Sequence, residues 1–183
     1  MNIAVYCGSR EGKDKAYLEA ARRLGAWIGK KGYGLVYGGS RGGLMGETAD
    51  AALENGAFVT GVIPDIPSIL ERKHPGLQKY IHTEDMARRR TRMIELADAF
   101  VALPGGLGTL DEVTEVLSLK SLGLVPGPVV FFGAADYYAP LKRVFENVVL
   151  SGFGESAYFD DVLFTEDLDE MERFIEARKK VKG

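Results

Sequence analysis

Short apolar runs alternate along this chain with longer stretches of helical period. The runs cover residues 3–7, 35–37, 58–63, 79–83, 99–103 and 129–132. Most of them are apolar at nearly every position, which is typical of parallel strands buried on both faces. Their alternation with helical segments predicts an α/β fold: a doubly wound, mostly parallel sheet in a Rossmann-like three-layer α/β/α arrangement.

The stretches between the runs carry helix signals. Residues 14–30 place Leu24 and Ile28 on one apolar stripe, and Gly32 follows as a stop signal. Residues 85–97 and 168–182 are also expected to be helical. Residues 64–77 open with a proline-rich segment and predict an irregular stretch that forms a lid or a rim loop.

The length fits one domain. The chain has 183 residues, of which 46% are hydrophobic, enough to build a core. No repeat, low-complexity tract or linker interrupts the pattern. Residues 1–183 are therefore expected to form a single Rossmann-like nucleotide-binding domain.

Charge and cysteine usage exclude several classes of protein. Lysine and arginine total 23 against 26 aspartate and glutamate residues, so no basic surplus favours nucleic acid as a partner. Cys7 is the single cysteine and cannot form an internal disulfide, and with only two histidines the chain predicts no zinc or other metal site. No run of about 18 apolar residues and no basic leader occurs, so a cytoplasmic protein without a membrane partner is expected.

Glycine is the one compositional excess. There are 23 glycines in 183 residues, about 13% and near twice the usual share. Three glycine-bearing turns follow predicted strands, at residues 8–9, 38–43 and 104–109. Ligands of open parallel sheets bind at the carboxyl ends of strands, and helix N-termini there favour anions, so phosphate is the expected ligand. The alternative is that the glycines only make tight turns.

Two common nucleotide fingerprints are absent, because neither G-x-G-x-x-G nor G-x-x-x-x-G-K-[ST] occurs in the chain. A lysine decarboxylase is disfavoured as well. Such a pyridoxal enzyme needs a Schiff-base lysine in a defined cofactor site, and no lysine adjoins the glycine turns.

The helix predicted over residues 85–97 carries arginines in unexpected positions. At about 100° per residue, Arg89 and Arg90 flank the apolar stripe of Met86 and Met93. Both guanidinium groups are therefore aimed toward the body of the protein. A buried cation needs an anionic partner, so a carboxylate or a bound phosphate is expected beside them. The alternative is that both side chains extend to solvent.

Glu112 also has two interpretations. It follows Thr109 in a T-x-x-E pattern, and on spacing alone a helix capping box is favoured. However, Glu112 and Glu115 share one helix face, within reach of a ligand held by the glycine turn at residues 104–109. A carboxylate beside a phosphate site suggests bond breaking near a sugar.

The remaining candidates have simpler interpretations. Cys7 is expected to be a small buried filler, and His74 a surface residue rather than a ligand. Trp27 and the Tyr137–Tyr138 pair are expected to serve packing.

Together, four segments resemble the LONELY GUY phosphoribohydrolases, which are often mislabelled lysine decarboxylases. These segments are V-Y-G-G at residues 36–39, G-L-M-G at 43–46, residues 86–93, and above all P-G-G-L-G-T-L-D-E at 104–112. The resemblance implies hydrolysis of the N-glycosidic bond of cytokinin riboside 5′-monophosphates, and often of AMP, to free base and ribose 5-phosphate. It implies no cofactor, and a homodimer with the site near the subunit interface.

Residue by residue, the resemblance implies that Arg89 and Glu112 are catalytic. It assigns nucleotide binding to a larger set: Gly8, Ser9, Gly38, Gly39, Met86, Arg90, Gly105, Gly106, Gly108, Thr109 and Glu115. The chain departs from the family pattern at four positions, where it has Ser40, Arg90, Leu119 and Ser121. The alternative function is a nucleotide or molybdenum-cofactor carrier without hydrolysis, for which a carboxylate aimed at the sugar has little use.

Overall fold

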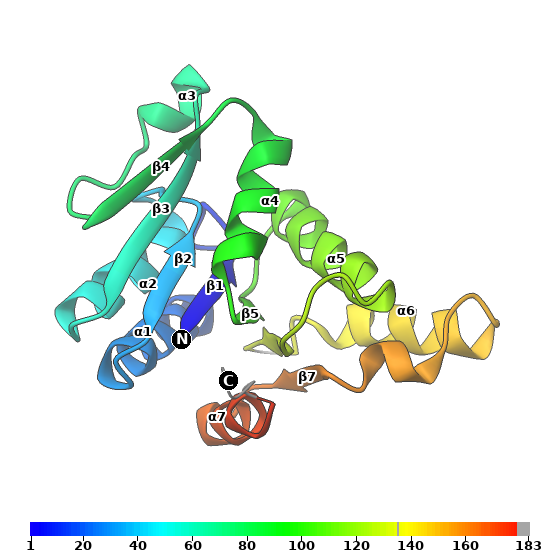
Figure 1. Ribbon diagram of the computed structural model, residues 1–183. Helices are drawn as coiled ribbons and strands as arrows, with labels where there is room; N and C mark the ends of the chain where they lie inside the picture. Colours follow the sequence, from blue (N-terminus) through cyan, green and yellow to red (C-terminus); the bar gives the residue numbers. More distant parts are fainter. Residues whose placement is uncertain (135, 179–183) are drawn as a thin grey trace.

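The computed structural model describes residues 1–134 and 136–178. Its strands form one sheet in the order β4-β3-β2-β1-β5-β6-β7, and every neighbouring pair is parallel (Figure 1). The predicted doubly wound parallel sheet is therefore confirmed. The strands are β1 (Asn2–Tyr6), β2 (Gly34–Tyr37), β3 (Phe58–Pro64), β4 (Lys79–Thr83), β5 (Ala99–Ala102), β6 (Val129–Phe132) and β7 (Val162–Thr165).

Helices cover both faces of the sheet. One face packs against α1 (Lys15–Lys30), α2 (Gly43–Glu54) and α7 (Leu168–Ala177), and the other against α4 (Met86–Leu96), α5 (Leu107–Ser121) and α6 (Ala139–Leu150). A short helix, α3 (Pro67–Leu70), and a 3-10 turn, η1 (Ser156–Phe159), lie in connections. This is the expected three-layer α/β/α arrangement.

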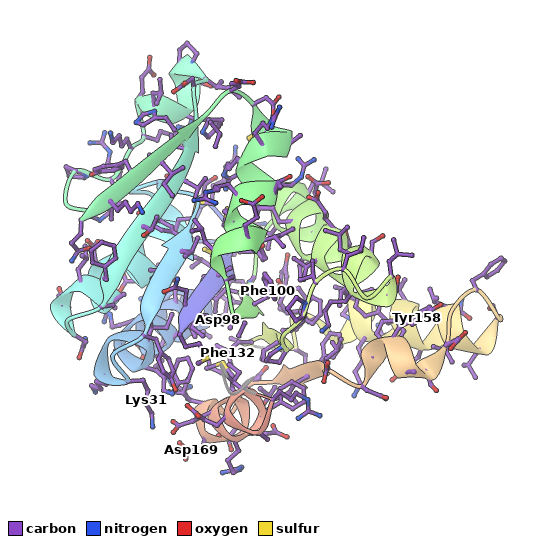
Figure 2. All side chains as sticks on the ribbon, viewed as in Figure 1. Lys31, Asp98, Phe100, Phe132, Tyr158 and Asp169 are labelled. Atoms are coloured by element: carbon purple, nitrogen blue, oxygen red, sulfur yellow. The ribbon has the colours of Figure 1, made fainter. Side chains whose placement is uncertain are left out.

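Both faces of each central strand are buried, which explains the continuous apolar runs. Ile3 and Val5 of β1 belong to the cluster beneath α1 and α2, whereas Ala4 and Tyr6 belong to the cluster beneath α4 and α5. Phe100 and Phe132, labelled in Figure 2, lie likewise in opposite clusters. Successive side chains of a strand point to opposite faces of the sheet. When helices cover both faces, every position is buried and the strand is apolar throughout.

Helix ends follow local side-chain chemistry. The Asp14 carboxylate accepts a hydrogen bond from the N–H of Ala16 (2.9 Å) at the start of α1, and Asp85 accepts one from the N–H of Arg88 (2.7 Å) at the start of α4. Gly32, in the left-handed region at φ 66°, follows α1. The helices predicted over residues 14–30 and 85–97 are thus confirmed, with the aspartates as caps.

Three segments depart from the sequence-based expectations. The pattern did not predict β7, because it is a four-residue edge strand with only half-buried side chains. The stretch 64–77, expected to be irregular, contains α3, which begins at a proline suited to the first helical turn. The helix predicted to reach Lys182 ends at Ala177, and residues 179–183 lie outside the described residues.

The strand order fixes where a ligand site lies. The chain builds outward from β1 through β2, β3 and β4, and then continues on the other side of β1 with β5, β6 and β7. The connections therefore diverge at the β1/β5 boundary, and a crevice forms outside the carboxyl ends of those strands. Within the described ranges, no helix is both long and apolar enough to cross a bilayer.

Candidate functional site

A cleft of about 450 Å³ opens at the β1/β5 boundary. The turn after β1 lines it with Gly8 and Ser9, and the turn after β5 lines it with Gly105 and Gly106. Tyr137, from the turn after β6, closes one side. The structure thus brings two of the three predicted glycine turns into one cleft at the switch point of the sheet.

Several glycines of the site are required by packing. A Cβ on Gly105 would lie 2.1 Å from Oγ1 of Thr109, and one on Gly8 would lie 3.1 Å from the carbonyl oxygen of Arg10. Gly39 has φ 76°, in the left-handed region, and a Cβ there would lie 2.5 Å from Ile63. For these positions the tight-turn interpretation is sufficient.

Gly106 and Gly108 are different. A Cβ at either position would meet no atom within 4 Å outside its own helix and chain neighbours, and neither residue has a positive φ. Both are exposed at the start of α5, whose first N–H groups have no intrahelical partner. Because the fold does not require glycine at these positions, an approaching ligand is the better explanation.

The open space at Gly108 predicts that Gly108→Ala stabilises the fold but weakens ligand binding. Gly108→Ala should raise the free energy of unfolding by about 0.4–1 kcal/mol, because it reduces the entropy of the unfolded chain at a compatible position. The added methyl group should weaken binding of AMP, the expected ligand, by about 1–3 kcal/mol. Urea unfolding and calorimetric titration measure the two effects.

The matched control is Gly76→Ala, where a new Cβ makes only an ordinary contact, 3.5 Å from His74 and outside the residues that line the cleft. If the Gly108→Ala protein is stabilised but binds AMP with wild-type affinity, Gly108 takes no part in ligand binding.

The capping-box interpretation of Thr109 and Glu112 is wrong. Helix α5 begins at Leu107 with Gly106 as its N-cap, so Thr109 lies inside the first turn and makes no cap. The helix begins at Leu107, three residues earlier than it would with Thr109 as its N-cap. Thr109 is buried against Gly105, and Glu112 is directed inward.

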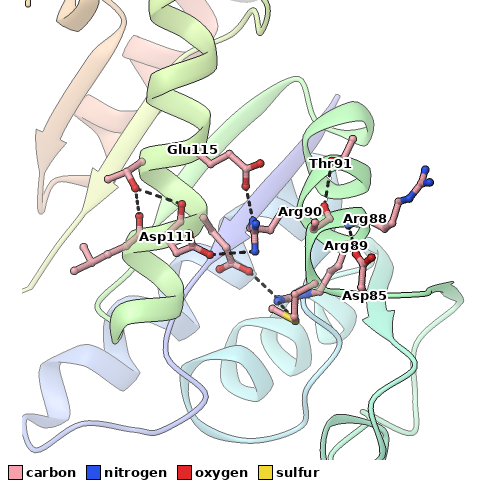
Figure 3. Close-up of polar contacts among 12 residues, drawn as sticks. Asp85, Arg88, Arg89, Arg90, Thr91, Asp111 and Glu115 are labelled. Atoms are coloured by element: carbon pink, nitrogen blue, oxygen red, sulfur yellow. Dashed lines mark hydrogen bonds and ion pairs between the residues drawn. The ribbon is translucent and has the colours of Figure 1, made fainter.

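The inward direction brings Glu112 to Arg89 of α4. Nη2 of Arg89 lies 2.9 Å from Oε1 of Glu112, and both side chains are less than a tenth exposed. Figure 3 shows Arg89 on α4, on the side that faces α5. Nε of Arg89 donates a hydrogen bond to the carbonyl of Val62 (3.2 Å). The helix-face prediction for Arg89 is therefore confirmed, and its anionic partner is a carboxylate.

The pair is close but incompletely satisfied. Nη2 of Arg89 is the ion-pair partner of the buried Oε1 of Glu112, and no other donor among the described residues hydrogen-bonds this oxygen. Burial raises the pKa of Glu112, and the charge of Arg89 opposes that rise. A buried carboxylate oxygen with a free lone pair is suited to accept a proton or to face a developing positive charge.

Gly38, after β2, makes room for this pair. A Cβ on Gly38 would lie 2.2 Å from Nη2 of Arg89. The sulfur of Met86 lies 3.8 Å from Nη1 of Arg89. The third glycine turn thus contributes to the site by admitting the guanidinium group.

Arg90 makes the neighbouring contacts between α4 and α5. Its Nε lies 2.5 Å from Glu115 and its Nη1 lies 3.2 Å from Asp111. Figure 3 shows these three labelled side chains between the two helices. All three are partly exposed. Arg90 and Glu115 thus form a second, outer pair beside the buried pair.

Other sequence-based expectations have mixed outcomes. Cys7 is buried as expected, and burial and the nearby Glu112 raise the pKa of its thiol, which disfavours the reactive thiolate form. Trp27 packs in the core as expected. The expectation that His74 lies on the surface is wrong, since the residue is only 6% exposed. Its main-chain N–H donates a hydrogen bond to the carbonyl of Gly39 (2.9 Å), and Nε2 of its ring lies 2.9 Å from Oδ1 of Asp50.

Sequence reasoning missed the role of Tyr137, expected only to pack. It lines the cleft, and its hydroxyl donates a hydrogen bond to the carbonyl of Gly105. One signal was available in the sequence: Tyr137 follows a predicted strand, as the glycine turns do.

The doubly wound sheet, the glycine-lined cleft at its switch point and the buried Arg–Glu pair define the class, a Rossmann-like α/β protein with a candidate anion site. The family model described as "Possible lysine decarboxylase" matches residues 45–174. The cytokinin riboside 5′-monophosphate phosphoribohydrolase of Rhodococcoides fascians is 40% identical over 169 residues, 92% of this chain and 85% of that protein. LOG7 of Arabidopsis thaliana, with the same enzyme name, is 39% identical over 82% of this chain and 70% of its own length.

The chain belongs to the family of cytokinin riboside 5′-monophosphate phosphoribohydrolases, as the resemblance predicted. The description of the family model suggests pyridoxal chemistry, which needs a Schiff-base lysine, but no lysine is among the described residues that line the cleft. Lys120 lies in the last turn of α5, and its side chain is only 8% exposed. Its ammonium group contacts Asp161 (3.4 Å) and the carbonyl of Gly127.

Solved structures show the same fold in other proteins. The molybdenum cofactor binding protein from Rippkaea orientalis has a TM-score of 0.74 at 21% identity, covering 96% of this chain and 95% of its own. The Moco carrier protein from Chlamydomonas reinhardtii has a TM-score of 0.70 at 22% identity, covering 96% and 98%. At this identity the likeness establishes the fold alone.

Proposed function

We propose that the chain hydrolyses the N-glycosidic bond of purine nucleoside 5′-monophosphates, AMP or isopentenyladenosine monophosphate, to free base and ribose 5-phosphate. The observation that carries the proposal is the buried Glu112 carboxylate, paired with Arg89 and lying one helical turn after the open position at Gly108. This arrangement supports an anion at the start of α5 with a carboxylate near the sugar attached to it.

In this proposal the phosphate binds at the N-terminus of α5. The N–H groups of the first turn, from Gly106 to Thr109, are suited to an anion because they lack intrahelical partners and lie at the positive end of the helix dipole. Gly8 and Ser9 face the same cleft. The absence of side chains at Gly106 and Gly108 permits close approach of the phosphate oxygens.

The bond between C1′ and the base nitrogen breaks with its electron pair leaving on the base, and positive charge develops on the ribose ring. The Glu112 carboxylate stabilises that charge and accepts a proton from the attacking water. The hydroxide adds to C1′, and Glu112 passes the proton that it took from water to the departing base, which restores the carboxylate. Arg89 holds Glu112 in place and favours its ionised form, opposing the effect of burial.

The direct test is incubation of the purified chain with AMP or isopentenyladenosine monophosphate, followed by chromatography of the free base. We expect base release whose kcat/KM falls as the pH is lowered through the pKa of Glu112. Only the ionised carboxylate acts as a base, and burial raises this pKa above its ordinary value of 4.5, so the acidic limb should lie above pH 4.5.

Two results would contradict the proposal. Tight AMP binding without base release would favour a carrier, the alternative that the shared fold leaves open. Base release that stays constant from about pH 4.5 to 8 would mean that no group with a raised carboxyl pKa acts as the base.

The proposal includes a homodimer. Leu122 and Leu124, just after α5, are 69% and 66% exposed, beside an apolar groove of about 360 Å³ that Ile94 and Leu119 help to line. Because α4 and α5 also carry Arg89 and Glu112, a second copy docked on this groove would lie near the site. Sedimentation analysis at assay concentrations tests the assembly state.

A further inference from the structure

The turn after β6 places two adjacent tyrosine hydroxyls on the glycine turn after β5. Tyr137 donates a hydrogen bond to the carbonyl of Gly105, and Tyr138 donates one to the carbonyl of Leu103 (2.7 Å). Both tyrosines also pack, since Tyr138 is 5% exposed and its ring meets Phe131 edge-to-face at 4.9 Å. Their hydroxyls, however, contact main-chain groups of the turn that begins α5.

The Pro104 carbonyl, which lies between those of Leu103 and Gly105, is also fixed. It accepts a hydrogen bond from the N–H of Gly8 (3.0 Å), in the turn after β1. Three successive carbonyls, at residues 103–105, are therefore each held by a group from a neighbouring element. None of these three residues lies in a helix or a strand, so these external groups fix the orientation of their carbonyls.

The anchor on Gly105 has the largest geometric consequence. In a trans peptide the carbonyl oxygen of one residue and the N–H of the next point in opposite directions, so fixing the oxygen of Gly105 fixes the N–H of Gly106. This peptide has glycine on both sides. Because neither residue has a Cβ, rotation of the peptide plane meets little steric resistance, and the turn alone does not hold its orientation.

We propose that Tyr137 is a positioning residue, whose hydroxyl keeps the Gly106 N–H turned away from Tyr137 and aligned with the N–H groups of the first turn of α5. It would thereby set the affinity for the phosphate of the ligand. The inference rests on the proposed function, since the site that it deepens is the same anion site. Tyr137 itself lines the cleft beside Gly105 and Gly106.

The ring of Tyr137 is held independently of its hydroxyl. It packs edge-to-face on Tyr17 at 5.6 Å and on Tyr138 at 5.0 Å. Phenylalanine should keep both contacts and remove only the hydrogen bond. The substitution Tyr137→Phe therefore separates the anchor from the packing.

The experiment measures binding of ribose 5-phosphate and of adenosine by calorimetry, together with AMP kinetics. In Tyr137→Phe, the Kd for ribose 5-phosphate and the KM for AMP should each rise about fivefold. A loss of this size corresponds to the net free energy of one hydrogen bond. Affinity for adenosine, which has no phosphate, and kcat should not change. Tyr158→Phe is the matched control, because Tyr158 lies on η1, away from α4 and β1 (Figure 2), and lines no part of the cleft.

Unchanged ribose 5-phosphate binding in Tyr137→Phe would overturn the inference. An equal loss of adenosine and ribose 5-phosphate affinity would also overturn it, because that result indicates a general structural role. If the wild type binds ribose 5-phosphate and releases no base from AMP, the proposed activity fails while the binding comparison still decides the role of Tyr137. If the wild type binds no ribose 5-phosphate, no anion site exists and the inference falls.

Discussion

Glu112→Gln is expected to lower kcat for base release from AMP by about 10²–10⁴, the usual contribution of a general base, with little change in AMP affinity. Glutamine has nearly the shape of glutamate and keeps an oxygen acceptor for Arg89, which also remains bound to the carbonyl of Val62 (3.2 Å). It loses the negative charge and the ability to accept a proton from water. Rapid-quench assays of adenine release and titration with AMP measure the two quantities.

The matched control is Glu47→Gln, because Glu47 also pairs with an arginine, Arg22, at 2.7 Å, but on the exposed side of α1 and α2. This variant should behave as wild type does. If Glu112→Gln releases adenine at the wild-type rate, the carboxylate has no part in the chemistry. A loss of AMP binding equal to the loss of turnover would instead make Glu112 a binding residue.

The fold was predictable because its signals are local. Continuous apolar runs at β1, β5 and β6 define doubly covered strands, and aspartates at positions 14 and 85 mark the starts of α1 and α4. The edge strand β7 escaped prediction, since half-buried side chains leave no continuous apolar run. Short strands at sheet edges are defined by their neighbours rather than by their own sequence.

The site was predictable in part. The position of Arg89 on an apolar helix face required an anion, and the structure supplies Glu112. The pairing itself was not visible, because it joins two helices and depends on Gly38 leaving room for the guanidinium group. The burial of His74 and the hydrogen bond of Tyr137 were not visible either. The main-chain N–H of His74 binds the carbonyl of Gly39, and the hydroxyl of Tyr137 binds the carbonyl of Gly105, and no side-chain pattern reports such contacts.

The buried pair also makes a prediction about stability. Arg89→Met should lower the free energy of unfolding at about pH 7 by roughly 3–5 kcal/mol, because it leaves Glu112 buried without a cation. The loss should shrink as the pH is lowered. Without Arg89 the folded-state pKa of Glu112 rises further above 4.5, so the folded state binds more protons than the unfolded state does, and stability increases toward acid. Urea unfolding at about pH 5 and pH 8 measures both effects.

The double variant Arg89→Met with Glu112→Leu tests whether the buried pair serves the stability of the fold or the chemistry of the site. Apolar residues of similar volume often replace a buried ion pair at no cost, so the double variant should recover most of the stability that Arg89→Met loses. It should release no base from AMP. A stable, inactive double variant would mean that the fold does not need this pair and that the site does. If the double variant instead keeps its activity, the chemistry lies elsewhere. If it stays as unstable as Arg89→Met alone, the pair is a structural element of the contact between α4 and α5.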